Sequence, residues 1–543
     1  MRFDAVPAFA VLLMVPALAA DTDQQRVDQI FAGYDKAGSP GCALGVIRDG
    51  AFIYRKGYGT ASLELGVPLS PQSVFYMGSV SKQFTAASVV LAAEQGFLSL
   101  DDDVRKYIPE LPDYGHPVRL RQMLHHTSGF RDVLSLLYLS GRDAADLHST
   151  DELIDLVARQ KALNYNPGEE FLYSNTNYFL LAEVVKRSTK KPLSVFAAEN
   201  IFQPLGMVHT RFYDDHTLVV PGRIPAYAPG KNDSFVADWS TNFDKVGDGG
   251  LMSSVDDLLL WDRNFYENRL GKGTLLKEMQ TRGVLNSGKQ ISYALGLALG
   301  NYRALPIVEH GGGLFGYRTE ILRFPEQRFT VVCLCNLSSA NPASLSRNVA
   351  DVYLEKDLQA ARAPLEVPGA GAVSDPSPFA GKYLDRRDYS VASFTVSAGN
   401  LVGWGMSLKR IGPSRFEDPF GAVVAFDNSS GVMKVKGTFQ DEDAFFTGTK
   451  IDELHLNDDA LAAYAGAYSS TELSATYKLS VENGNLMLRK NWNSPQKLNP
   501  LVRDGFESGD IVTLVFQRDA DGRISGISVF AAGRIRNVTF KKD

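Results

Sequence analysis

Ser79-Val80-Ser81-Lys82 stands directly before a strongly helical run, Gln83 to Glu94, and Gly96 is placed to end that helix. A serine and a lysine three residues apart lie on the same side of a helical turn. The free N–H groups at a helix start favour a developing oxyanion, and a buried lysine with a lowered pKa can take a proton from a serine. We therefore predict Ser79 as a nucleophile and Lys82 as its base.

The composition is that of a folded protein with more than one domain. The chain has 543 residues, of which 44% are hydrophobic and 22% charged, so two or three domains are expected. The net charge is −6, and no basic stripe or run of Lys and Arg occurs. Nucleic acid is therefore not expected as a partner.

The N-terminus has the features of a secretory signal peptide. Arg2 precedes an apolar run from Val6 to Leu18, and the small residues Ala19 and Ala20 follow. The run is too short for a membrane span. We predict a signal peptide over residues 1–20 and an exported protein, periplasmic or secreted, without stable membrane insertion.

Three cysteines do not suggest a disulfide framework. Cys333 and Cys335 alternate in a strand-like run, so both side chains face one way and are expected to be small buried hydrophobes. Cys42 lies in another apolar stretch and has no evident partner.

Residues 21–355 mix helices and strands. Strands at both ends with helices between them predict an α+β domain, in which a sheet is closed by early and late strands beside a helical subdomain. The expected elements are a hairpin over Gly41 to Tyr58 that turns at Asp49-Gly50, helices at Ser79–Gln95, Thr176–Arg187 and Val255–Tyr266, and strands at Tyr293–Leu299 and Phe329–Asn336.

After a Pro- and Gly-rich linker at residues 356–378, the chain repeats itself. Phe379-Ala380-Gly381-Lys382-Tyr383 matches Tyr464-Ala465-Gly466-Ala467-Tyr468, and Gly399-Asn400-Leu401 matches Gly484-Asn485-Leu486, both 85 residues further on. Alternating apolar residues and Asn-Gly or Asp-Gly turns predict two small antiparallel β-barrels, residues 379–460 and 461–543. Neither copy has a metal, nucleophile or phosphate motif, so a scaffold role or a homodimer surface is expected.

Two further groups of residues could take part in catalysis. Tyr173-Ser174-Asn175 stands before a helix, where Tyr173 could share a proton with Lys82 and pass it to a leaving group. His310-Gly311-Gly312-Gly313 lies just ahead of a strand, and the N–H of Gly313 could form an oxyanion hole with that of Ser79. Taken alone, these groups also fit a half-buried tyrosine, a helix cap and a flexible turn.

Together and in this order, the three groups resemble the serine β-lactamase and penicillin-binding protein superfamily, in its class C-like branch. That branch includes D-alanyl-D-alanine carboxypeptidases, D-aminopeptidases and β-lactamase-type esterases, and the resemblance covers roughly residues 25–350. No cofactor is expected, and no metal either, since the adjacent His125 and His126 lack a metal-binding arrangement. The resemblance also implies that Ser79 is acylated, that Lys82 and Tyr173 transfer protons, and that Asn175 bonds to Lys82 or to the substrate. His310 would face Tyr173 on a strand edge, beside Gly311 and Gly312. The backbone amides of Ser79 and Gly313 would hold the oxyanion.

The sequence departs from the β-lactamase pattern at one motif. His310-Gly311-Gly312 stands where those enzymes usually carry Lys-Thr-Gly, and a histidine is mostly neutral at neutral pH. D-aminopeptidases of this type also carry two C-terminal β-barrels, so a peptidase for D-amino-acid-containing peptides is expected. Alternatives are a short-chain esterase, a weak β-lactamase, and a penicillin-binding or sensor protein that does not turn over. Whether water or an amine accepts the acyl group stays open.

Overall fold

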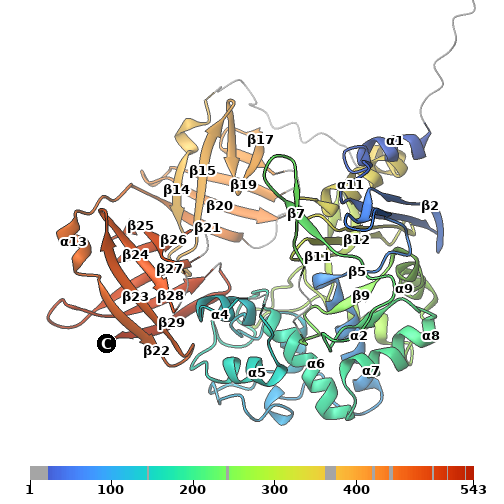
Figure 1. The fold of residues 1–543 in the computed structure, drawn as a ribbon, viewed down its shortest axis with the longest axis horizontal. Helices are drawn as coiled ribbons and strands as arrows, with labels where there is room; N and C mark the ends of the chain where they lie inside the picture. Colours follow the sequence, from blue (N-terminus) through green and yellow to red (C-terminus); the bar gives the residue numbers. More distant parts are fainter. Residues whose placement is uncertain are drawn as a thin grey trace, which may run out of the picture.

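The computed structural model describes residues 22–143, 146–239, 244–360, 375–418, 422–439, 444–491, 494–509, 512–531 and 533–543. The predicted signal peptide, residues 1–20, and residues 361–374 of the predicted linker lie outside the described residues. Figure 1 shows an N-terminal unit of helices and sheet beside two β-barrels.

A six-stranded sheet in the order β10-β11-β12-β13-β1-β2 forms the centre of the N-terminal unit. β1 (Cys42–Arg48) pairs antiparallel with β13 (Phe329–Cys335), so early and late strands close the sheet as predicted. The other strands are β2 (Ala51–Tyr58), β10 (Ala298–Tyr302), β11 (Leu305–Leu314) and β12 (Tyr317–Phe324).

Helices cover both faces of this sheet. Side chains alternate along β1, so Leu44 joins the core under α1 (Asp23–Phe31) and α11 (Pro342–Tyr353), whereas Ile47 joins the core under α2 (Ser81–Glu94) and α9 (Val255–Glu267). The remaining helices are α3 (Leu120–Leu124), α4 (Val133–Leu139), α5 (Thr150–Ala158), α6 (Asn175–Thr189), α7 (Leu193–Ala197), α8 (Gln203–Leu205), α10 (Leu275–Met279) and α12 (Glu355–Ala360). Short strands are β3 (Thr60–Ser62), β4 (Val67–Pro68), β5 (Phe75–Tyr76), β6 (Arg211–Phe212), β7 (Tyr227–Pro229), β8 (Phe235–Ala237) and β9 (Leu251–Ser253).

Two predicted strand boundaries are wrong. The strand expected at Tyr293–Leu299 begins at Ala298, because Gly296 has a φ of +70° and lies against the backbone of α2, where an added Cβ would be 2.6 Å from Lys82 O. The glycines expected just ahead of a strand lie inside β11. The Gly-rich run is therefore a strand edge, as the resemblance implied, and not the flexible turn that the run alone also fits.

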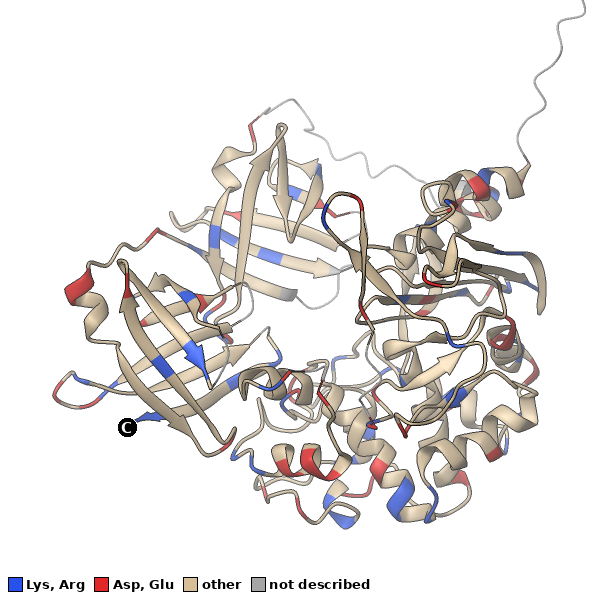
Figure 2. Cartoon of the chain, in the orientation of Figure 1, with Lys and Arg blue, Asp and Glu red and all other residues tan. Residues whose placement is uncertain are grey.

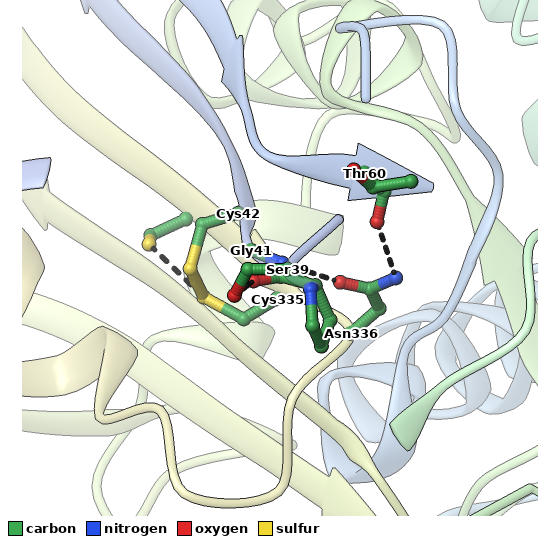
Figure 3. The surroundings of a disulfide bond; sticks show 8 residues. Ser39, Gly41, Cys42, Thr60, Cys335 and Asn336 are labelled. Atoms are coloured by element: carbon green, nitrogen blue, oxygen red, sulfur yellow. Dashed lines mark hydrogen bonds between the residues drawn. A yellow bond between two sulfur atoms is a disulfide. The ribbon is translucent and has the colours of Figure 1, made fainter. Parts of the chain in front are cut away.

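The expectation that Cys335 is a small buried hydrophobe like Cys333 is also wrong, because Cys335 is the partner that the sequence did not show for Cys42. Cys42 and Cys335 are directly opposite each other on β1 and β13 and form a disulfide, which Figure 3 shows beside Asn336. Cys333 remains a buried thiol. The pairing brings together strands that are far apart in sequence, and no spacing rule indicates it.

The C-terminal half forms two closed antiparallel barrels, which confirms the predicted fold class. The equivalent Gly381 and Gly466 begin the first strands of the two copies. The first barrel comprises β14 (Gly381–Leu384), β15 (Val391–Ser397), β16 (Asn400–Gly403), β17 (Met406–Gly412), β18 (Arg415–Glu417), β19 (Ala422–Asp427), β20 (Lys434–Phe439) and β21 (Ala444–Ile451). After α13 (Asp458–Ala462), the second comprises β22 (Gly466–Ser470), β23 (Ala475–Glu482), β24 (Asn485–Lys490), β25 (Gln496–Val502), β26 (Gly505–Ser508), β27 (Val512–Arg518), β28 (Ile524–Ala531) and β29 (Ile535–Lys542).

The second barrel packs directly on the N-terminal unit, next to α4 (Figure 1). Arg131 and Glu472 form an ion pair of 2.6 Å across this contact, and their side chains are 2% and 3% exposed. The Tyr477 hydroxyl donates to the carbonyl of Leu139 at 2.7 Å. A buried ion pair and a buried hydrogen bond therefore join the second barrel to the N-terminal unit.

Basic and acidic residues are interspersed along the ribbon in Figure 2. Within the residues that the structure describes, no helix has the length and apolar character needed to cross a bilayer.

Candidate active site

Ser79 lies in the 3-10 turn Gly78–Val80, immediately before α2. Gly78 has a φ of +53°, and a Cβ there would lie 2.6 Å from the backbone nitrogen of Gly313, so only glycine lets the turn approach β11 this closely. Ser81 fastens the turn, since its hydroxyl donates to Gly78 O at 2.6 Å and accepts from the N–H of Leu251. Ser79 is half-buried and lines a cavity of about 590 Å³.

The Lys82 amine is fully buried beside Ser79. Its Nζ lies 3.1 Å from Ser79 Oγ, 2.9 Å from Asn175 Oδ1 and 2.6 Å from the carbonyl oxygen of Asp248. Burial lowers the pKa of Lys82 to about 7, even though the carboxylates of Asp248 and Asp132 act in the opposite direction. A neutral amine that can accept the Ser79 proton is therefore available near neutral pH.

Tyr173 completes a cluster with Ser79 and Lys82. The ring centre of Tyr173 is 4.8 Å from Lys82 Nζ and 4.2 Å from the ring centre of His126. Burial raises the pKa of Tyr173, and a hydrogen bond with Ser79 partly opposes that shift. Tyr173 is thus a phenol at neutral pH, suited to donate a proton while Lys82 accepts one.

The Asn175 side chain is oriented by Asp132, a residue that the sequence analysis missed. Asp132 Oδ2 accepts from the Asn175 backbone N–H and from its side-chain amide, so Oδ1 of Asn175 faces Lys82. Asp132 also caps α4 by accepting from the N–H of Ser135. In the sequence, Asp132 fits only a helix cap, because an acidic residue directly before a helix is typical of one.

The glycines of β11 let this strand lie against the Ser79 turn. An added Cβ on Gly312 would be 2.1 Å from Met77 O and 3.0 Å from the backbone nitrogen of Ser79. The N–H groups of Ser79 and Gly313 therefore belong to two backbones in contact at the cavity, as an oxyanion hole requires. On the other face of β11, Gly311 leaves space above the buried carboxyl of Glu320.

His310 lies in the cavity as an uncharged group. Its Nδ1 donates to Gly311 O at 2.7 Å, and its Nε2 accepts from the Tyr293 hydroxyl at 2.9 Å. Burial, together with the nearby Lys82, lowers the pKa of His310 to about 4. The rings of His310 and Tyr173 are neighbours, 6.4 Å apart, but both nitrogens of His310 are already engaged.

The second barrel contributes Arg534 to the same cavity, which no sequence signal indicated. The structure thus brings together Ser79, Lys82, Tyr173, Asn175, His310, Gly311, Gly312 and Gly313, and adds Asp132, Tyr293 and Arg534. A candidate nucleophile, a neutral amine, a buried phenol and backbone N–H groups lie together, and these are the groups that acyl transfer requires.

Known proteins share this chain's sequence and fold. The sequence model described as Beta-lactamase matches residues 27–354. Penicillin-binding protein 4* of Bacillus subtilis is 30% identical over 302 residues, which cover 53% of this chain and 66% of that protein. The D-aminopeptidase of Brucella canis is 25% identical over 536 residues, which cover 93% of this chain and 96% of that protein.

The fold likeness extends over both barrels. The octameric penicillin-binding protein homologue from Pyrococcus abyssi superimposes with a TM-score of 0.53 at 19% identity, covering 96% of this chain and 99% of that one. The match to the family model spans more than half of the sequence and includes Ser79, Tyr173 and His310. The chain therefore belongs to the Beta-lactamase family of serine hydrolases, and the predicted relationship to serine β-lactamases and penicillin-binding proteins is confirmed.

Proposed function

We propose that this protein hydrolyses amide bonds next to D-amino acids through a covalent acyl-enzyme on Ser79. The observation that carries the proposal is the buried Lys82, whose pKa of about 7 leaves it free to accept a proton 3.1 Å from Ser79 Oγ. The near full-length similarity to a D-aminopeptidase, barrels included, supports the D-residue preference.

In the proposed reaction, Lys82 takes the Ser79 proton as Oγ attacks the substrate carbonyl. The N–H groups of Ser79 and Gly313 stabilise the oxyanion, which is typically the largest contribution to such catalysis. The proton then passes through Tyr173 to the leaving nitrogen as the C–N bond breaks. Water, deprotonated by the same pair, attacks the acyl-enzyme and releases the acid and free Ser79.

The test compares two serines that share the Ser-x-x-Lys spacing. Ser79→Ala should abolish turnover of D-alanyl p-nitroanilide and covalent labelling. Ser188→Ala is the matched control, because Ser188 has Lys191 three residues on but bonds only the α6 carbonyl of Val185 among the described residues. Retained turnover in Ser79→Ala would refute the proposal.

Parallel assays separate the alternatives within this chemistry. His310 is neutral where β-lactamases usually carry a lysine, so nitrocefin should be a poor substrate. A nitrocefin or p-nitrophenyl butyrate rate far above that of the D-alanyl amide would assign a β-lactamase or an esterase instead. A stoichiometric acyl adduct without turnover would assign a sensor.

Export and self-association stay predictions. The disulfide between Cys42 and Cys335 is of a kind that persists in oxidising compartments, which supports export. N-terminal sequencing of the protein recovered from the periplasm or medium would test cleavage near residue 20. Light scattering would test the homodimer expected through the β-barrels.

A further inference from the structure

Arg534 lies in the turn between β28 and β29 of the second barrel and reaches the cavity at Ser79. Its guanidinium carbon is 5.2 Å from the ring centre of Tyr173. The side chain is partly buried and therefore partly shielded from water. A second domain thus places a permanent positive charge beside the reacting groups.

The position of Arg534 is fixed by contacts with the N-terminal unit. Asn164 Nδ2 donates to Arg534 O at 2.9 Å, and Asn164 Oδ1 accepts from the backbone N–H of Arg536 at 2.8 Å. The guanidinium of Arg536 makes a two-pronged pair with Glu170, at 2.9 and 3.1 Å. These bonds hold the chain at Arg534 and at Arg536, two residues further on, against the N-terminal unit.

Among the described residues, no carboxylate pairs with the charge of Arg534. Within the part of the chain that the structure describes, its guanidinium makes no ion pair and no side-chain hydrogen bond. The other permanently basic residues that line the cavity are engaged, since Lys245 pairs with Asp248 and Arg347 with Glu309. A shielded guanidinium without a partner is suited to bind an anion from a ligand.

The location of Arg534 indicates which part of a substrate carries that anion. Tyr173 delivers the proton to the leaving nitrogen in the proposed function, so the leaving group lies against Tyr173. Arg534 stands over the same ring. His310 stands where β-lactamases usually carry a lysine. Because His310 is neutral, it supplies no positive charge for a substrate carboxylate.

We propose that Arg534 binds the terminal carboxylate of the leaving amino acid, so that the preferred substrates are peptides with a D-residue before a free C-terminal residue. This inference rests on the proposed function and narrows it to carboxypeptidase-type cleavage. The acyl C–N bond breaks, the Ser79 Oγ–C bond forms, and the leaving nitrogen takes its proton from the Tyr173–Lys82 pair. The first product is an amino acid with an intact carboxylate.

The test measures binding and does not need turnover. On a Ser79→Ala background, the affinity for N-acetyl-D-alanyl-D-alanine is compared with that for its C-terminal amide by calorimetry. The acid should bind more tightly. Arg534→Gln should lower the acid-to-amide affinity ratio about 10- to 100-fold, as expected for loss of a charged hydrogen bond. Arg534→Lys should restore part of it.

Arg503→Gln is the matched control, because it removes the same charge from the same barrel at a side chain that is 86% exposed. Equal binding of acid and amide by the Ser79→Ala protein, or an unchanged ratio in Arg534→Gln, would overturn the inference. A failure of the proposed function would give a different result, because hydrolysis would then persist in Ser79→Ala. The ratio of acid to amide affinity does not depend on turnover and would be unchanged.

Discussion

Asp132 Oδ2 accepts two hydrogen bonds from Asn175, at 2.7 Å from the backbone N–H and 2.9 Å from the side-chain amide. This contact fixes the amide so that its oxygen meets Lys82 at 2.9 Å. Asp132 does not itself line the cavity and acts through Asn175, which does, so Asp132 is a positioning residue.

Asp132→Asn should lower kcat/KM about 10- to 100-fold. The NH2 group of the new side chain would face the N–H groups of Asn175, where the carboxylate oxygen now accepts hydrogen bonds. The Asp132 carboxylate also raises the pKa of Lys82, so its removal should move the acidic limb of the pH profile to lower pH. Asp101→Asn, at a side chain that is 61% exposed, should change neither. A lower rate with an unmoved acidic limb would indicate a merely structural role.

The pKa of Lys82 predicts the pH dependence of the reaction. Since only the neutral amine accepts a proton, kcat/KM for a neutral substrate should fall as the pH drops below about 7. His310 has a pKa of about 4 and adds no limb near neutrality. Lys82→Arg keeps the charge but stays protonated, so it should cost about 10²- to 10⁴-fold in rate. A flat profile across this range would move the base role to Tyr173.

The two glycines nearest Ser79 should respond differently to an added methyl group. In Gly312→Ala, the Cβ would meet Met77 O at 2.1 Å, so β11 must move away from the Ser79 turn and activity should fall about 100-fold or more. In Gly313→Ala, the nearest atom is Arg318 Cδ at 3.5 Å, an ordinary contact. Rates of acylation by an active-site label would measure both variants, and equal losses would contradict the tight approach at Gly312.

The parts of the site that sequence predicted are those whose geometry is local. Ser79 and Lys82 share one helical turn, and Tyr173 and Asn175 share the start of α6, so spacing alone relates them. Arg534 enters the site through packing of a separate barrel, and Cys42 meets Cys335 through strand pairing. Such contacts depend on the tertiary fold, and no periodicity in the sequence encodes them.

The disulfide should stabilise the N-terminal unit without taking part in the chemistry. Replacing Cys42 and Cys335 together by alanine should lower the stability by about 2–5 kcal/mol, since the bond closes a long loop between β1 and β13. The thermal midpoint should fall, while kcat/KM at 25 °C should change little because neither residue lines the cavity. Cys333→Ala, which removes a buried thiol without a disulfide, is the control. Equal midpoints for the double and control variants would refute this role.

The ion pair between Arg131 and Glu472 should decide whether the second barrel stays on the catalytic cavity. Glu472→Gln leaves the buried Arg131 guanidinium without its counter-charge, which typically costs about 3–5 kcal/mol. Because Arg534 belongs to the same barrel, loosening this contact should reduce the acid-to-amide preference as Arg534→Gln does. Glu507→Gln is the control, since Glu507 pairs with Lys382 of the first barrel and does not join the second barrel to the N-terminal unit. Small-angle scattering should then show a more extended particle for Glu472→Gln than for Glu507→Gln. An extended particle that keeps its acid preference would show that the carboxylate is bound without Arg534.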